Sequence, residues 1–257
     1  MDRKRQRKYE PRGGRYRKKH KIWKKGFPLF LSMIMVLLIR FAPQIQQYAP
    51  WLYQIIFHEQ NISIDEIPDY SGEPYVVINN NIPAFTEEEL TTIAYESYSR
   101  QDILGRCGTA IACIDQSLMP TQSRESISSV HPTGWQVATY DFIDGDYLYN
   151  RCHLIGFQLT GENANEKNLI TGTRYMNVDG MLPFENMVAE YVRETDDPVM
   201  YRVTPIYEGY NLVAEGVQME AYSVEDDGDS ICFNVFVYNV QPGVEIDYAT
   251  GDNRLAG

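Results

Sequence analysis

The stretch Tyr147–Tyr191 constrains the fold most, because its apolar residues change there from the spacing of a strand to that of a helix. From Tyr147 to Ile155, aromatic and aliphatic residues alternate with polar ones, which is the period of a β-strand. A polar loop follows, and a second strand is expected around Asn168–Thr173. From about Met176, apolar residues recur every three or four positions, which is typical of one helix face. The sequence therefore predicts the order strand, loop, strand, helix.

Two side chains suited to hydrolytic chemistry lie in this stretch, one at the end of the first strand and one at the start of the helix. His153 closes the first strand, and a neutral histidine can accept a proton from water at ordinary pH. Asn177 opens the helix, and its amide oxygen is a ligand that Mg²⁺ accepts. Each has a plainer interpretation, since Asn177 can cap the helix and His153 can be a core histidine. Glu185, further along the helix, can be an ordinary surface acid. The order and spacing of the set favour a site.

These residues, in this order, resemble the DNA/RNA non-specific endonucleases, which belong to the ββα-metal (His-Me finger) nucleases. Within that family the chain looks most like the DNA-entry and secreted DNase branch of Gram-positive bacteria. The Asp-Arg-Gly-His signature of the family stands here as NRCH at Asn150–His153. Asn168, Asn177 and Glu185 match further family positions. The resemblance extends from roughly Pro68 to the C-terminus.

The resemblance implies hydrolysis of phosphodiester bonds in DNA, with RNA as a further substrate and Mg²⁺ as cofactor, Mn²⁺ being an alternative. It implies His153 as general base and Asn177 as metal ligand. Glu185 lies at i+8 from Asn177, roughly 80° around an α-helix, and would hydrogen-bond the waters of the metal. Arg151 shares a strand face with His153 and would hold the scissile phosphate, so that His153, Arg151 and Glu185 form the catalytic set.

Arg174 and Asn168 are the further substrate-binding candidates. The two departures from the signature leave the base and the metal ligand in place. Asn150 removes a charge but keeps hydrogen-bonding capacity, and Cys152 adds a side chain on the strand face opposite His153. We therefore expect activity, with the effect of both departures on its rate left open.

The charge of the chain is divided very unevenly, and this is the main physical objection to a nuclease. Residues 1–25 carry 13 Lys and Arg against two acids, a net charge of +11, whereas residues 26–257 carry 10 against 33, a net charge of −23. An acidic body has the wrong sign to steer a polyanion. Two alternatives therefore stay open, a catalytically weak, membrane-anchored nucleic-acid receptor and a surface interaction module.

The N-terminal quarter predicts a membrane anchor. After the basic tail of residues 1–25, residues 26–42 are almost wholly apolar, interrupted by Ser32 and Arg40. The length lies between that of a signal-peptide core and a full span of about 17–25 residues, and no small-x-small cleavage site follows. We expect an uncleaved signal anchor with the tail in the cytoplasm, a juxtamembrane linker at 43–70 and an extracellular nuclease domain at 71–257. Secretion after cleavage is the alternative.

The fold class expected for the domain is α+β, with a mainly antiparallel central sheet and a ββα-metal finger against one face. Apart from the finger, strands are expected from their β-branched and aromatic content at Tyr75–Asn79, Leu104–Asp115, Ala138–Asp146, Val199–Tyr207, Val213–Ser223 and Ser230–Asn239, with an edge strand near Ile246–Tyr248. A helix is expected from Thr86, because Glu89 three residues later completes a capping box.

The remaining features leave several questions open. Met119–Trp135 reads as a long loop, which is usually functional or disordered, and it contains Arg124 and His131. His131 is expected to be incidental. The four cysteines include no C-x-x-C pair, and a bridge between Cys107 and Cys113 is left open. Strand preference, biological role and oligomeric state are not predicted.

Overall fold

The computed structural model describes residues 64–257 and, before them, Leu37, Arg40 and Phe41. The predicted basic tail, most of the predicted anchor and most of the linker therefore lie outside the described residues. Within the part that is described, the structure contains no helix of the length and apolar character that a bilayer span requires.

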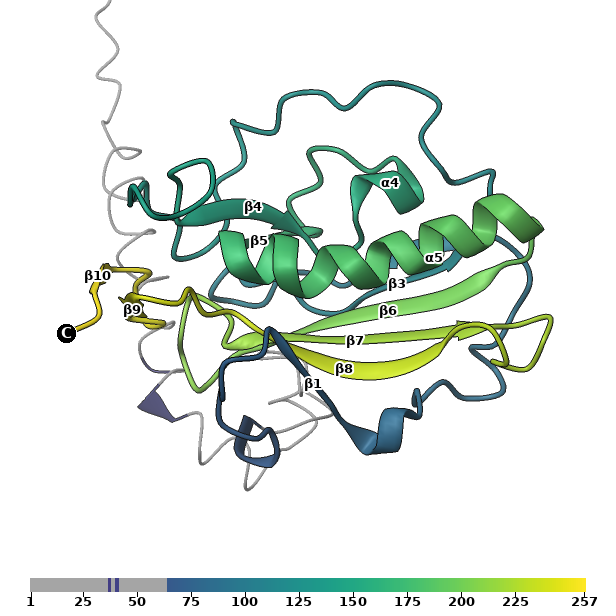
Figure 1. The fold of residues 1–257 in the computed structure, drawn as a ribbon, viewed down its shortest axis with the longest axis horizontal. Coiled ribbons are helices and arrows are strands. Elements are labelled where there is room, and N and C mark those ends of the chain that lie inside the picture. Colours follow the sequence, from purple (N-terminus) through teal and green to yellow (C-terminus); the bar gives the residue numbers. More distant parts are fainter. Residues whose placement is uncertain (1–36, 38–39, 42–63) are drawn as a thin grey trace, which may run out of the picture. The chain divides into compact units, whose positions relative to one another are not determined.

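A six-stranded sheet forms the centre of the described domain (Figure 1), with the strand order β1-β8-β7-β6-β3-β2. All of its described pairings are antiparallel, which confirms the predicted mainly antiparallel sheet. The strands are β1 (Tyr75–Val77), β2 (Tyr95–Tyr98), β3 (Ala110–Ile114), β6 (Val199–Ile206), β7 (Gly216–Ser223) and β8 (Cys232–Tyr238). The three long strands β6, β7 and β8 are buried almost throughout, because both faces of the sheet are covered.

Two predicted strands form differently from the expectation. Ala138–Asp146 makes only an isolated bridge between Thr139 and Tyr147, because the chain turns back on itself between Tyr140 and Asp146, where Asp146 has a φ of 66°. The expected C-terminal edge strand pairs instead in a small separate sheet of β9 (Val244–Ile246) with β10 (Asn253–Leu255). Strand β2 was not predicted.

A second small sheet and the helix after it form the unit that the sequence predicted. Strand β4 (Tyr149–His153) pairs antiparallel with β5 (Leu169–Thr173), with Arg151 opposite Thr171. The chain then forms η3 (Met176–Met181), a π-helical segment that continues into α5 (Leu182–Thr195). The predicted order strand, loop, strand, helix is therefore confirmed. The loop contains one unpredicted element, the short helix α4 (Phe157–Thr160).

Helix α5 lies across one face of the six-stranded sheet (Figure 1) and shares the main hydrophobic core with it. Its inward side chains Phe184, Val188 and Val192 are buried there, which matches the apolar period of the sequence. The π-helical segment approaches the sheet even more closely. A Cβ atom at Gly180 would lie 2.3 Å from Cγ1 of Val237 in β8, so only glycine fits at this contact.

The opposite face of the sheet carries a buried polar cluster. Arg202 forms ion pairs with Glu220 at 2.7 Å and with Glu89 at 3.0 Å, and its guanidinium lies over the ring of Phe85. The helix predicted from Thr86 does not form, although both hydrogen bonds of the capping box do. The prediction was wrong because Glu89 also binds Arg202, which ties this segment to the sheet as a single turn, and tertiary contacts override helix propensity.

The described cysteines Cys107, Cys113, Cys152 and Cys232 are all free thiols. Cys107 donates to the carbonyl of Leu169, and Cys113 donates to the carbonyl of Thr91. The bridge that the sequence left open between Cys107 and Cys113 is therefore not formed.

Gly180→Ala tests the close approach of the π-helical segment to β8. The added methyl group must displace Val237 or the helix, and overpacking of this kind costs about 1–3 kcal/mol. We expect urea denaturation to show that loss in the free energy of unfolding. Met187→Ala, at a position 46% exposed on α5, is the control and should change it by no more than about 0.5 kcal/mol. Equal stability of Gly180→Ala and the parent would contradict the packing described.

Candidate active site

A cavity of about 660 Å³ lies where β4, the start of the helical segment and the loop before β4 meet. Five of the six site residues expected from the sequence line it, together with Arg124 from the long loop. The five are Arg151, His153, Arg174, Asn177 and Glu185. Side chains from separate elements therefore converge on one space large enough for a small part of a polymer.

His153 is buried at the end of β4, and both of its ring nitrogens have partners. Its Nε2 lies 2.8 Å from the carbonyl oxygen of Asn163, and its Nδ1 lies 3.2 Å from Nη2 of Arg124. A guanidinium only donates, so Nδ1 is the acceptor and the ring proton resides on Nε2. Burial and the Arg124 charge lower the pKa of His153 to about 4, against the hydrogen bond to Asn163. The imidazole is therefore neutral at physiological pH.

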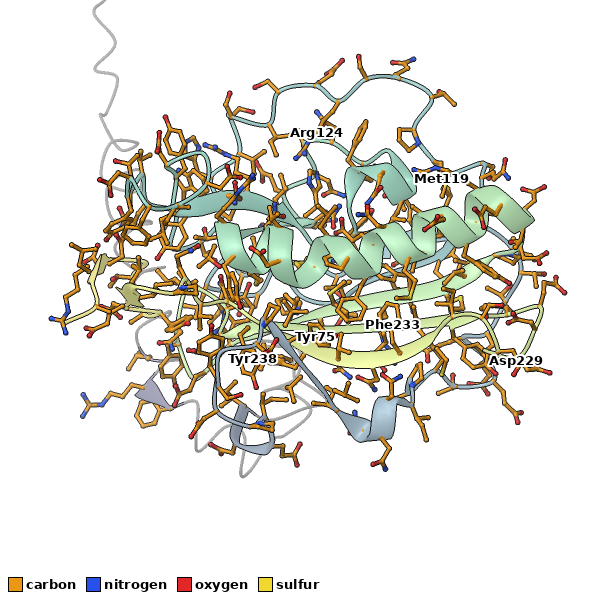
Figure 2. The ribbon with its side chains drawn as sticks, viewed as in Figure 1. Tyr75, Met119, Arg124, Asp229, Phe233 and Tyr238 are labelled. Carbon is orange, nitrogen blue, oxygen red and sulfur yellow. The ribbon has the colours of Figure 1, made fainter. Side chains whose placement is uncertain are left out.

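Arg124 is a functional candidate that the sequence did not single out. It stands on the long loop of residues 119–135 (Figure 2), whose length alone suggested a functional segment. Neither motif nor spacing connects it with His153, because the contact joins residues far apart in the chain. His131, on the same loop, is exposed and hydrogen-bonds Ser129, so it does not line the cavity.

Arg151 holds this loop against β4. Its Nε and Nη2 donate to the backbone carbonyls of Val130 and Ser128, and its guanidinium lies over the Trp135 ring, 4.1 Å from the ring centroid. Arginine has five N–H donors, so some remain for a phosphate. The structure therefore gives Arg151 a role in loop positioning in addition to the phosphate contact expected from the sequence.

Asn177 lies inside the π-helical segment and not at its N-cap, which is Tyr175 and makes no side-chain capping bond. Its amide oxygen accepts a hydrogen bond from the thiol of Cys152, with 3.0 Å between Oδ1 and Sγ. Burial raises the pKa of that thiol, so it keeps its proton. Gly172 on the paired strand β5 leaves room for the cysteine side chain, because a Cβ there would lie 2.7 Å from Cβ of Cys152. The unusual cysteine of the NRCH stretch thus contacts the candidate metal ligand directly.

Glu185 is buried with its carboxylate packed against Gly156, where a Cβ atom would lie 2.5 Å from Oε2. Burial raises the pKa of Glu185 to about 7, and the hydrogen bond from Gln158 and the Arg124 charge oppose this rise. The 80° estimated between Asn177 and Glu185 assumed an unbroken α-helix. A π-helical turn with i→i+5 hydrogen bonds lies between them, so that estimate does not apply, although both residues line the same cavity.

The other two predicted residues differ in their positions. Arg174 lines the cavity and forms an ion pair of 2.7 Å with Asp144, and its Nε is buried without a hydrogen-bond partner. Asn168 is fully buried and does not line the cavity. Its amide exchanges two hydrogen bonds of 2.9 and 3.0 Å with the backbone of Ile155, which fixes the chain just after β4.

The charge at the cavity has the opposite sign to that of the body. Among the described residues, its lining contains the three arginines Arg124, Arg151 and Arg174 and one acid, Glu185. Arg106, by contrast, is buried away from the cavity in an ion pair of 2.7 Å with Asp102. Three of the nine Lys and Arg residues of 64–257 therefore line the cavity, where a phosphate would bind.

The donor groups of the cavity fit a hard divalent cation held by few protein atoms. No cluster of three or more His, Cys, Asp and Glu side chains that could bind a metal occurs among residues 64–257 or the three described before them. Asn177 and Glu185 nevertheless supply an amide oxygen and a carboxylate to the same cavity. Mg²⁺ retains most of its waters and needs only one or two protein oxygens, so this set is sufficient for it.

Comparison with known proteins gives a consistent result. The family model for DNA/RNA non-specific endonucleases matches residues 87–225, more than half of the chain. A deoxyribonuclease of Streptococcus dysgalactiae subsp. equisimilis is 34% identical over 110 residues, which are 41% of this chain and 32% of that protein. The match therefore spans only about a third of the length of this relative.

Two solved structures are similar over most of the chain. NucA from Streptococcus agalactiae with a bound magnesium ion has a TM-score of 0.65 and 28% identity, covering 76% of this chain and 92% of that one. The Sda1 nuclease with a bound zinc ion has a TM-score of 0.55 and 26% identity, covering 72% and 97%.

The Arg124–His153 contact predicts a shifted titration. Nuclear magnetic resonance of the metal-free protein should show His153 titrating near pH 4, and Arg124→Gln should raise this pKa because it removes a neighbouring positive charge. Burial persists, so the pKa stays below the ordinary 6.5. Arg193→Gln, at an exposed position of α5, is the control and should leave it unchanged. If the pKa of His153 were the same in Arg124→Gln as in the parent, the contact would not form in solution.

The burial of Glu185 predicts a pH-dependent stability. The pKa of Glu185 rises from 4.5 to about 7 on folding. Its contribution to the free energy of unfolding is therefore fully favourable below pH 4.5 and is lost as the pH rises through 7. Glu185→Gln removes this loss, and its unfolding free energy in metal-free buffer should exceed that of the parent at pH 8, by at most about 3 kcal/mol. The gain should shrink by pH 4.5. Glu190→Gln, exposed on the same helix, should show no such trend.

Proposed function

This chain belongs to the DNA/RNA non-specific endonuclease family, and we propose that it is a magnesium-dependent endonuclease that hydrolyses phosphodiester bonds of DNA, and of RNA, without sequence preference. One observation carries the proposal. A neutral histidine with its proton-accepting nitrogen turned toward Arg124 shares a cavity with an amide oxygen, a carboxylate and two more arginines. The β4–β5–η3–α5 unit is then the ββα-metal finger.

Phosphodiester hydrolysis requires a deprotonated water, positive charge where negative charge develops, and neutralisation of the leaving oxygen. Nδ1 of His153 would take the proton of the attacking water. The Nε2–H donates to the carbonyl of Asn163, so that the ring is held in the required tautomer and the imidazolium that forms keeps an acceptor. Arg124 must first release Nδ1, and a phosphate anion is a stronger acceptor for its guanidinium than a neutral imidazole.

Asn177 and Glu185 would hold the metal ion, Asn177 through Oδ1 and Glu185 through water molecules. A bound Mg²⁺, or Mn²⁺ in its place, would stabilise the charge that develops on the phosphate and on the leaving oxygen. The Cys152 thiol keeps the amide oxygen of Asn177 oriented, and Gly156 leaves the space in which the Glu185 carboxylate lies.

The remaining arginines would bind the phosphate. Arg151 reaches it with the donors that the loop carbonyls leave free, and Arg174 reaches it in exchange for Asp144. Asn168 would act indirectly, because it fixes the chain between β4 and α4. The basic tail, the apolar segment of residues 26–42 and the linker to residue 70 support a cell-membrane anchor with the nuclease domain outside. Cleavage of the segment would release the same domain.

Plasmid cleavage tests the function and the base together. Full-length protein is incubated with supercoiled plasmid, and separately with RNA, with Mg²⁺ or with a chelator. We expect magnesium-dependent nicking that His153→Ala reduces by about 10²–10⁴-fold, because the substitution removes the proposed acceptor of the water's proton. His131→Ala, an exposed histidine outside the cavity, should keep full activity. If folded wild-type protein bound DNA without cutting it, the receptor alternative would replace the nuclease.

Asn177→Ala tests the metal ligand. The variant should lose cleavage and, in calorimetric titration with Mn²⁺, the binding heat of the parent, because it removes the amide oxygen proposed as the metal ligand. Circular dichroism should show an unchanged fold. Magnesium activation that survives in Asn177→Ala would place the metal elsewhere.

A further inference from the structure

The part of the cavity formed by residues 135–149 is not used by the proposed chemistry. Most of the side chains that line it are aromatic or apolar, and they are Trp135, Gln136, Val137, Ala138, Tyr147 and Tyr149. A strand rises about 3.3 Å per residue, so Tyr147 lies as much as ~20 Å along the chain from His153. Contacts made there reach nucleotides beside the scissile phosphate, and not the phosphate itself.

The aromatic residues of this region differ in their freedom to bind a ligand. The Trp135 ring is covered by the guanidinium of Arg151, and the buried Tyr149 donates its hydroxyl to the carbonyl of Gly251. Tyr147 is 57% exposed, while its backbone is fixed by the bridge to Thr139. A ring with a fixed backbone and an open face is the arrangement that stacks a planar ligand with little loss of conformational entropy.

A cation lines the cavity from the position just after β5, the strand that pairs with β4. The backbone N–H of Arg174 donates to the carbonyl of Leu148, the residue that follows Tyr147, and Arg174 lines the same cavity. Its Nε is buried without a partner. Sites for single-stranded nucleic acids combine these two elements, an aromatic ring for the base and a cation for the backbone.

The negative charge of residues 26–257 makes stacking an important source of affinity for a nucleic acid. Residues 26–257 carry a net charge of −23, so long-range attraction to a polyanion is weak and affinity must come from short-range contacts. Stacking of a base on an aromatic ring contributes about 1–3 kcal/mol and does not depend on net charge. In a duplex the faces of the bases are already stacked, so a tyrosine gains this energy only on an unpaired base.

We propose that Tyr147 is a stacking subsite for an unpaired nucleobase and that it makes single-stranded nucleic acid the preferred substrate of the cavity. Val137, 76% exposed, borders the same region and supplies apolar contact to the base. The inference rests on the proposed nuclease function and adds the strandedness of its substrate.

The test compares Tyr147→Ala with the parent on a fluorescent single-stranded oligonucleotide and on the matching duplex. Binding is measured by anisotropy in a chelator, and kcat/KM is measured with Mg²⁺, both with the full-length protein. We expect the parent to prefer the single strand. Tyr147→Ala should weaken single-strand binding and kcat/KM by about 5- to 150-fold, with duplex values within about twofold. Tyr147→Phe should retain the single-strand preference, because it keeps the ring.

Two controls separate stacking from other effects. Phe142→Ala removes an aromatic ring that is 52% exposed but does not line the cavity. It should change neither binding nor kcat/KM on either substrate. Arg174→Gln should weaken the binding of both substrates and reduce its salt dependence, as expected for a lost phosphate contact. Tyr147→Ala should leave the salt dependence of binding unchanged.

Equal losses on both substrates, or no loss in Tyr147→Ala, would overturn the subsite while leaving a nuclease in place. Binding of single strands that depends on Tyr147, in a protein that cuts neither substrate, would support the subsite and overturn the nuclease function instead.

Discussion

The packing of η3 and α5 against the six-stranded sheet determines where the parts of the site lie. Val188 and Val192 bury the helix in the main core, and the close contact at Gly180 leaves the π-helical segment little freedom. Asn177 and Glu185 extend from this anchored element toward the cavity. The small β4–β5 sheet then needs only local contacts to bring His153 to them, and the Cys152–Asn177 hydrogen bond is one of these.

The same arrangement explains how an acidic domain can act on a polyanion. Among the described arginines, Arg106, Arg202 and Arg254 form ion pairs with carboxylates away from the cavity. Arg124, Arg151 and Arg174 line it, and of these Arg174 is paired with Asp144. Positive charge is therefore local, and its effect does not extend far, because salt screens charges beyond about 10 Å. An enzyme of this kind gains little from electrostatic steering and would depend on contacts made after encounter, which we propose come from arginine donors and from the exposed ring of Tyr147.

Local patterns in the sequence were sufficient for the order of the elements, and five of the six predicted site residues line one cavity, although their roles stay predictions. The change of apolar period within Tyr147–Tyr191 is a local property, and the structure has strand, strand and helix in that order. The helix from Thr86 failed because a distant partner, Arg202, binds Glu89. The angle expected between Asn177 and Glu185 around the helix was wrong, because a π-helical turn has no clear signal in the local sequence. Long-range contacts and backbone irregularities are the features of the structure that the periodicity of the sequence does not predict.

Arg124 shows most clearly what such a contact adds, because one charge acts on two acid–base groups. Burial lowers the pKa of His153 most, and the Arg124 charge adds to this lowering, so that the proposed base is neutral. The same charge also lowers the pKa of Glu185, against the burial that favours the protonated acid. Both groups are thereby moved toward the protonation states that metal-assisted hydrolysis needs at neutral pH. The position of Arg124 depends in turn on the loop that Arg151 holds to β4 through the carbonyls of Ser128 and Val130. Arg151 of the NRCH stretch therefore supports the proposed chemistry first through the loop that it positions, and the phosphate contact proposed for it would be a second role.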